Sequence, residues 1–192
     1  MPEPKRKKKT QPDARRMKFL SDFMSALDIT VVDMAKKMKV STVSVFHWFN
    51  ENCDDIRLSQ AMDAIEMYGY VLNISLTRPG DCVGPVMTDY QNLVENIDGT
   101  IRLKRMGFIF VALDRYDINI MDLVHRMGVQ YSTWRYWCST DNLMISRVFQ
   151  IADALGLSVR FDIKKRQDNG HASEGRRCIV HISIDSSYPL EG

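Results

Sequence analysis

Apolar residues recur every three or four positions along most of this chain, a spacing that predicts amphipathic helices. The pattern indicates four helices followed by one strand, and this series then occurs a second time. The helices are expected at about 14–27, from Thr30 to near Met38, at 41–50 and at 58–68, and again at 103–115, from Asn119, at 131–139 and at 145–155. The first helix would bury Phe19, Leu20, Phe23, Met24 and Leu27.

Three short segments alternate apolar and polar residues, as half-buried strands do. They are 70–76, 157–163 and 178–185, and the first two follow the fourth helix of each series. Each is too short to be stable alone. We therefore expect 70–76 and 157–163 to pair in one small antiparallel sheet. The third segment follows a polar loop and would fold back on 157–163 as a hairpin at the edge.

Local signals support the helix boundaries. A short polar side chain stands three residues before a carboxylate at Thr30 and Asp33, and again at Asn119 and Asp122. This arrangement caps the unpaired N–H groups at a helix start. The fourth helices end at Gly69 and Gly156, where glycine accepts a left-handed conformation.

The two series are copies of one unit. At an offset of 89, residues 15–49 align with 104–138, and identical pairs include Asp28/Asp117 and Trp48/Trp137. After a polar loop that is two residues shorter in the second copy, the offset becomes 87 and pairs Ile74 with Phe161. A match of this length predicts two copies of one supersecondary unit.

The repeat divides the chain into five parts. We expect a disordered basic tail at 1–13, copy one at 14–77, a linker at 78–100, copy two at 101–166, and a loop with a C-terminal strand at 167–192. In each copy, the second and third helices are separated by a three-residue turn. This is the spacing of a helix-turn-helix, whose second helix can enter the major groove of DNA.

The segment TVVDMAKKMKVSTVSVFHWF (30–49) resembles the phage-repressor/Cro (XRE-type) helix-turn-helix family, and NIMDLVHRMGVQYSTWRYWC (119–138) resembles it more weakly. The resemblance covers about 18–76 and 104–163. It implies a mainly α fold of two tandem repressor-like units and a DNA-binding function. The family usually carries a phosphate-contacting polar residue where this chain has Val31 and Ile120. Its turn glycine is kept as Gly128 but is replaced by Lys39, which then needs a positive φ or a modified turn.

Positions that pack between the helices stay apolar in both copies, whereas the residues that the family turns outward differ. Val40, Val45 and Trp48, and likewise Val129, Trp134 and Trp137, are expected to hold the third helix against the second. The outward positions are Ser41, Thr42, Ser44, Phe46 and His47 in copy one, and Gln130, Tyr131, Thr133, Arg135 and Tyr136 in copy two. Gln can pair bidentately with adenine and Arg with guanine, so copy two has the better set for base reading.

Charge is unevenly distributed along the chain. Residues 1–17 carry seven Lys or Arg against two acidic residues, 18–78 carry six against eight, and 101–166 carry eleven against six. The basic segments are the candidates for contact with a polyanion. The tail adds a run of five cations that we expect to touch nucleic acid regardless of sequence: Lys5, Arg6, Lys7, Lys8 and Lys9.

Several function classes receive no support from the sequence. No nucleophile motif, phosphate-binding glycine loop or paired-carboxylate constellation is present, so we expect neither an enzyme nor a cofactor. The four cysteines and four histidines lack metal-ligand spacing, and no apolar stretch is long enough to span a bilayer. The cysteines are expected to be free thiols in a reducing cytoplasm.

The sequence thus favours a sequence-specific regulator that binds double-stranded DNA in the cytoplasm of a bacterium or a phage-infected cell. The two copies would act as a pseudo-dimer. The alternative is a structural or interaction protein that reuses the fold, contacts a protein partner or associates with itself through edge strands, and touches nucleic acid only through its tail. The acidic first copy and the apolar Val31 and Ile120 favour this alternative.

Overall fold

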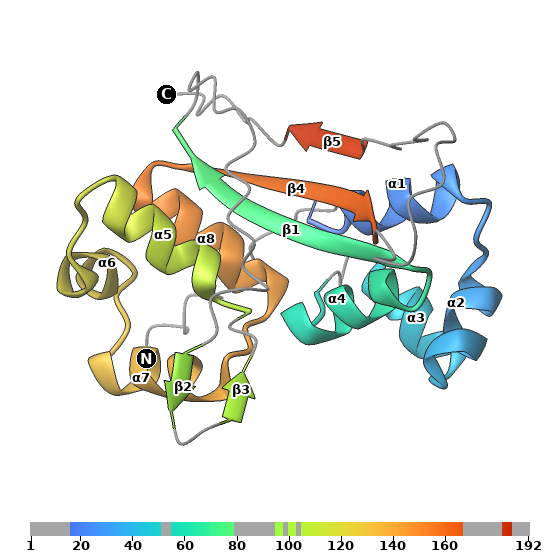
Figure 1. The fold of residues 1–192 in the computed structure, drawn as a ribbon, viewed down its shortest axis with the longest axis horizontal. Helices are drawn as coiled ribbons and strands as arrows, with labels where there is room; N and C mark the ends of the chain where they lie inside the picture. Colours follow the sequence, from blue (N-terminus) through green and yellow to red (C-terminus); the bar gives the residue numbers. More distant parts are fainter. Residues whose placement is uncertain are drawn as a thin grey trace, which may run out of the picture.

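In the computed structural model, the described residues are 16–50, 55–78, 95–97, 100–102, 105–166 and 182–185. They are mainly helical, with a small antiparallel sheet (Figure 1). Copy one contains α1 (Lys18–Ala26), α2 (Val31–Met38), α3 (Thr42–Trp48), α4 (Leu58–Glu66) and β1 (Tyr70–Thr77). Copy two contains α5 (Gly107–Arg115), α6 (Ile120–Arg126), α7 (Tyr131–Thr140), α8 (Ile145–Leu155) and β4 (Ser158–Lys165). The predicted order of four helices and a strand therefore occurs twice.

The predicted antiparallel sheet between the copies is confirmed. β1 pairs with β4 along its whole length, from Tyr70 opposite Lys165 to Thr77 opposite Ser158. A third strand, β5 (Ile182–Asp185), pairs antiparallel with the other edge of β4, which gives the order β1-β4-β5. The predicted C-terminal strand thus occupies the expected edge, although the part of it before 182 lies outside the described residues.

The segment between the copies differs from the prediction of a plain linker. β2 (Glu95–Ile97) and β3 (Thr100–Arg102) form a separate antiparallel pair there. Both first helices begin later than predicted, at Gly107 rather than near 103 in copy two and at Lys18 rather than near 14 in copy one. Period-two alternation cannot be recognised in strands of only three residues, which explains why the pattern missed them.

The predicted caps and turns are present. Thr30 Oγ1 accepts the N–H of Asp33, and the Asp33 carboxylate accepts the N–H of Thr30, so copy one has the full reciprocal box. In copy two, Asn119 Oδ1 instead accepts the N–H of Met121 at 2.7 Å. Gly69 and Gly156 have φ values of +80° and +65°.

The turn between the second and third helices has the same backbone in both copies. Gly128 has φ +63°, and Lys39, which replaces it in copy one, has φ +56°. Lys39 therefore tolerates the left-handed conformation, and the turn is not modified. Asp28 and Asp117, another equivalent pair, both have φ +52°. The repeat is thus retained in the unusual backbone positions as well as in the core.

A pseudo-twofold axis relates the copies, and two contacts locate it. Ile74 lies directly opposite Phe161 in the sheet, and Arg57 forms an antiparallel bridge with Met144. In both contacts the partners are 87 residues apart, which is the offset between the copies in this region. Two equivalent positions can face each other in this way only where an axis passes between them. The copies are therefore arranged as the subunits of a symmetric dimer are.

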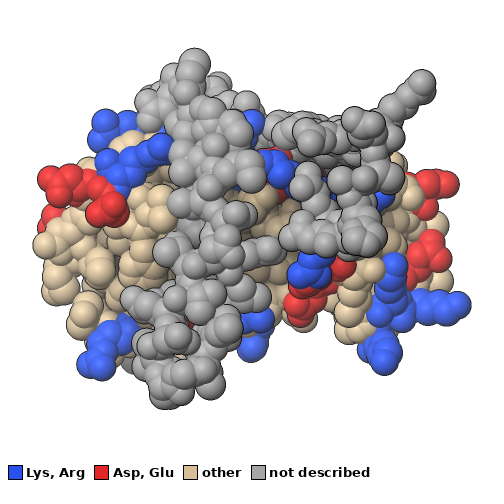
Figure 2. Space-filling view, in the orientation of Figure 1, with Lys and Arg blue, Asp and Glu red and all other residues tan. Residues whose placement is uncertain are grey.

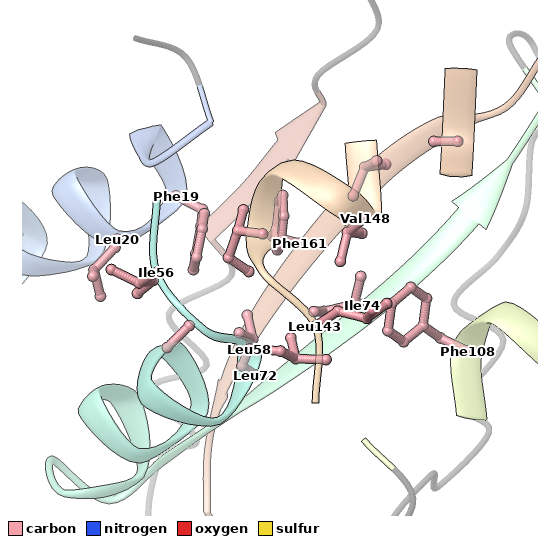
Figure 3. Packing of buried hydrophobic residues seen from close by; sticks show 14 of the residues in the cluster. Phe19, Leu20, Ile56, Leu58, Leu72, Ile74, Phe108, Leu143, Val148 and Phe161 are labelled. Carbon is pink, nitrogen blue, oxygen red and sulfur yellow. The ribbon is translucent and has the colours of Figure 1, made fainter. Parts of the chain in front are cut away.

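The same symmetry governs the core. Each strand crosses onto the first helix of the other copy, as Figure 1 shows for β1 over α5 and β4 beside α1. The Phe161 ring of β4 stacks on Phe19 of α1, with ring centroids 4.1 Å apart. At the equivalent place, Ile74 of β1 lies beside Phe108 of α5 (Figure 3). Both copies consequently contribute to one continuous core.

Candidate nucleic-acid interface

The helices α3 and α7 are equivalent in the two copies and are the sites of the predicted base contacts. Both lie on the side of the molecule away from β5, one on each side of the pseudo-twofold axis (Figure 1). Each follows a helix, α2 or α6, across the left-handed turn at Lys39 or Gly128. The outer faces of these two helices are therefore the surfaces to compare.

The inner faces of these helices are packed largely as predicted. Val45 and Trp48 of α3 are buried, and so is Trp134 of α7. The predicted core role of Val40 needs correction, because its side chain is exposed. Val129 and Trp137 are half-buried and pack against the core. The Trp137 ring has the Arg147 guanidinium of α8 above it, at 5.6 Å from the ring centroid.

The outer face of α7 has hydrogen-bonding and aromatic groups. Gln130, Tyr131, Arg135 and Tyr136 are exposed, whereas Thr133 is half-buried. The Gln130 side chain does not cap the helix. Tyr131 and Arg135 are four residues apart, so they project from one side of the helix. All the predicted outward positions of copy two except Thr133 are thus accessible.

The outer face of α3 is different in chemistry. Ser41 Oγ caps the helix by accepting the N–H of Ser44, and the two hydroxyl oxygens are 2.7 Å apart. These two hydroxyls are therefore engaged with each other, Thr42 is half-buried, and His47 is exposed. Sequence reasoning missed Val43, which is exposed and stands where copy two has Ser132. Aligning the copies position by position would have drawn attention to it.

Basic residues adjoin α3 despite the acidic total of copy one. Over 30–49 the chain has three lysines, Lys36, Lys37 and Lys39, against one acidic residue, Asp33. Over 119–138 there are two arginines against Asp122. Figure 2 shows Lys and Arg side chains at both lower corners of the view, where Figure 1 places the α2–α3 region and α7. The net charge of each copy therefore misrepresents the charge near its third helix. The tail cations Lys5, Arg6, Lys7, Lys8 and Lys9 lie outside the described residues.

The two positions that depart from the family pattern are used for packing. Val31 and Ile120 are half-buried and lie against the core. They leave the starts of α2 and α6 without a polar side chain at that position. Any phosphate contact in this region must therefore come from other residues, such as the lysines near α3.

Two titratable groups near these helices have shifted pKa values, and each shift has a local cause. Hydrogen bonds from Thr30 hold the pKa of Asp33 below its ordinary value. Burial, with a contribution from Asp141, raises the pKa of the Cys138 thiol on α7, so this thiol stays protonated at neutral pH. Within the described ranges, no three His, Cys, Asp or Glu residues are grouped as metal ligands. Nor does this part of the chain contain a helix that is long and apolar enough to cross a membrane.

Comparisons of this chain with protein-family models, with curated protein sequences and with solved structures give no match.

Proposed function

We propose that this chain is a sequence-specific DNA-binding protein of the repressor-like helix-turn-helix type, in which the two copies act as a covalent pseudo-dimer on double-stranded DNA. In this proposal α3 and α7 are the recognition helices. The observation that carries it is the pseudo-twofold axis, which is defined by Ile74 opposite Phe161 and Arg57 opposite Met144 and which relates the two exposed helices. Dimeric helix-turn-helix proteins use such an axis to address two half-sites about 34 Å apart along the duplex.

The differing outer faces support an asymmetric site. α7 offers Gln130 and Arg135, whose amide and guanidinium groups suit adenine and guanine in the major groove. Tyr131, Tyr136 and Thr133 have hydroxyls that suit phosphates, as do Ser41, Thr42 and Ser44 of copy one, and the ring N–H of His47 can donate to a phosphate or a base. A bacterial or phage transcriptional regulator is the role that fits this arrangement, and the basic tail would add affinity regardless of sequence.

The rival candidate is an interaction protein that reuses the fold. It is favoured by one observation, the exposure of Val43 and Phe46 on α3, because apolar side chains on a helix face suit a protein partner. In that case duplex DNA would be retained only through the basic tail.

Selection from random duplexes distinguishes the two. The purified full chain is incubated with 30-base-pair random duplexes at several salt concentrations, and the retained DNA is sequenced. The proposal expects an enriched motif of two unlike halves about 10 base pairs apart. An Arg135→Ala variant should lose preference in one half alone. Retention without any enriched motif would refute sequence-specific binding and support the rival.

A further inference from the structure

The third helices of the two copies differ most at two equivalent positions. Val43 of α3 stands where α7 has Ser132, and Phe46 stands where α7 has Arg135. The side chains of Val43 and Phe46 are 62% and 61% exposed, whereas Val45 between them is fully buried. Being three residues apart on a helix, the exposed pair projects from one side and forms a contiguous apolar surface.

This surface does not stabilise the fold, since most of each side chain remains in water. The polar groups beside it are also poorly suited to read bases by hydrogen bonding. Ser41 and Ser44 are bonded to each other, and neither offers the two-pronged geometry that distinguishes one base from another. Apart from His47, the exposed groups of α3 that could contribute to specificity are its apolar side chains.

The charge around the apolar pair favours nucleic acid over a protein partner. Lys36 and Lys39 precede α3 and are exposed. Residues 30–49 contain three lysines and one acidic residue. An apolar helix surface preceded by exposed cations is complementary to a groove between phosphates. The major groove offers one apolar group to such a surface, which is the 5-methyl group of thymine.

We propose that α3 reads the 5-methyl groups of thymine through Val43 and Phe46, whereas α7 reads its half-site by hydrogen bonding. This inference rests on the proposed function and makes it more specific. The half-site under copy one would contain thymine at one or more positions beside α3. Burying one methyl-sized group is worth about a fourfold change in affinity.

The test replaces thymine by deoxyuridine, which keeps the hydrogen-bonding edge and lacks only the methyl group. Starting from a duplex selected by the full chain, each thymine is replaced singly, and binding is measured by fluorescence anisotropy. We expect about fourfold weaker binding at each contacted thymine. In Val43→Ala or Phe46→Ala, the difference between thymine and deoxyuridine at that position should disappear.

Val32→Ala is the matched control, because Val32 is 60% exposed but lies on α2. It should keep the full sensitivity to deoxyuridine. All three variants alter exposed side chains, and unchanged thermal unfolding verifies that they fold.

Three results would overturn the inference. If the duplex is bound with sequence preference but every thymine tolerates deoxyuridine, the methyl contact is refuted while the proposed function stands. If no duplex is preferred over another, the proposed function itself fails. If Phe46→Ala leaves DNA affinity unchanged and abolishes self-association in sedimentation, the apolar face is a contact between copies of this chain.

Discussion

Ile74 and Phe161 lie directly opposite each other in the β1–β4 pair, and they are the same position of the two copies. Around them, each strand packs on the first helix of the other copy, as the stacking of Phe161 on Phe19 shows. Neither copy therefore has a complete core of its own. The relative placement of α3 and α7, on which the proposed function depends, is fixed by this shared core.

Phe161→Ala should consequently destabilise both copies together. The ring is almost completely buried between Phe19 and Phe149, so its removal leaves a cavity that costs about 3–5 kcal/mol of unfolding free energy. Urea unfolding followed by circular dichroism should show one cooperative transition, at lower urea in the variant. Two separate transitions in the wild-type chain would contradict the shared core. Tyr136→Ala, an exposed aromatic of α7, serves as the control and should leave the midpoint unchanged.

Each copy also caps the fourth helix of the other. The Asp55 carboxylate of copy one accepts the N–H of Ser146 at 2.9 Å, and Asn142 of copy two accepts the N–H of Ser59 at 3.1 Å. Asp55 and Asn142 are equivalent positions, 87 residues apart. The unpaired N–H groups at the starts of α8 and α4 are thus satisfied across the axis.

Asp55→Ala should therefore lower the unfolding free energy by about 1–2 kcal/mol, the usual cost of losing a helix cap. Asp55→Asn should cost much less, because the asparagine at the equivalent position performs the same task. Chemical denaturation of the three proteins measures both effects. Equal losses in Asp55→Ala and Asp55→Asn would show that the charge, rather than the accepted hydrogen bond, stabilises this contact.

Much of this fold was predictable from short-range patterns. Helical spacing, the Thr30 cap and the glycines at 69 and 156 predicted element types and ends, because these signals act within a few residues. The repeat offset also predicted that β1 and β4 would pair. The crossing of each strand onto the other copy was not predictable, since nothing in the local sequence says which of two similar first helices a strand covers.

The candidate site was less predictable than the fold. The exposure of most outward positions agrees with the family pattern, although Thr42 and Thr133 are half-buried. Val40 and Val43 were misjudged or missed because apolar residues are assumed to be buried. Total charge per copy was also misleading, because the acidic residues of copy one are spread over 22–66 while its lysines at 36–39 adjoin α3. Side-chain exposure and the charge near one helix can be determined only when the arrangement of the helices is known.

Lys39 and Gly128 provide a pair of opposite substitutions at one backbone position. Lysine at φ +56° bears a steric cost that glycine does not, and a Cβ atom added at Gly128 would meet no atom within 4 Å. Gly128→Lys should therefore lower the unfolding free energy by about 1 kcal/mol through the backbone alone. Lys39→Gly should leave it unchanged or raise it by up to about 1 kcal/mol.

The same Lys39→Gly variant should bind DNA less tightly, since it removes a cation beside α3. If Lys39 contacts one phosphate, the slope of log affinity against log salt should decrease by about 0.9. Affinity would then fall without a loss of stability, which a general loss of structure cannot produce. A Lys39→Gly chain with unaltered salt dependence would place Lys39 away from the duplex.

Deleting residues 1–12 tests the role of the basic tail. Its five consecutive cations, from Lys5 to Lys9, would neutralise up to about five phosphates, each contributing roughly 0.9 to the salt slope. The deletion should flatten the salt dependence and keep the preferred sequence, because the tail offers charge without fixed geometry. An unchanged slope after deletion would exclude the tail as a contact.

Arg135→Ala tests whether α7 reads bases by hydrogen bonding. Arg135 is exposed on α7 and has the paired donors that guanine accepts, so its loss should cost about 1–3 kcal/mol of binding free energy and relax preference at one base position. His47→Ala, at an exposed position of α3, should cost less. Both variants are measured on a selected duplex after their thermal unfolding is shown to match the wild type. Trp137 is unsuitable for this comparison, because its half-buried ring packs against Trp134 and its removal would disturb the helix itself. If His47→Ala proves more damaging than Arg135→Ala, or if neither changes binding, hydrogen-bonded reading does not reside in α7.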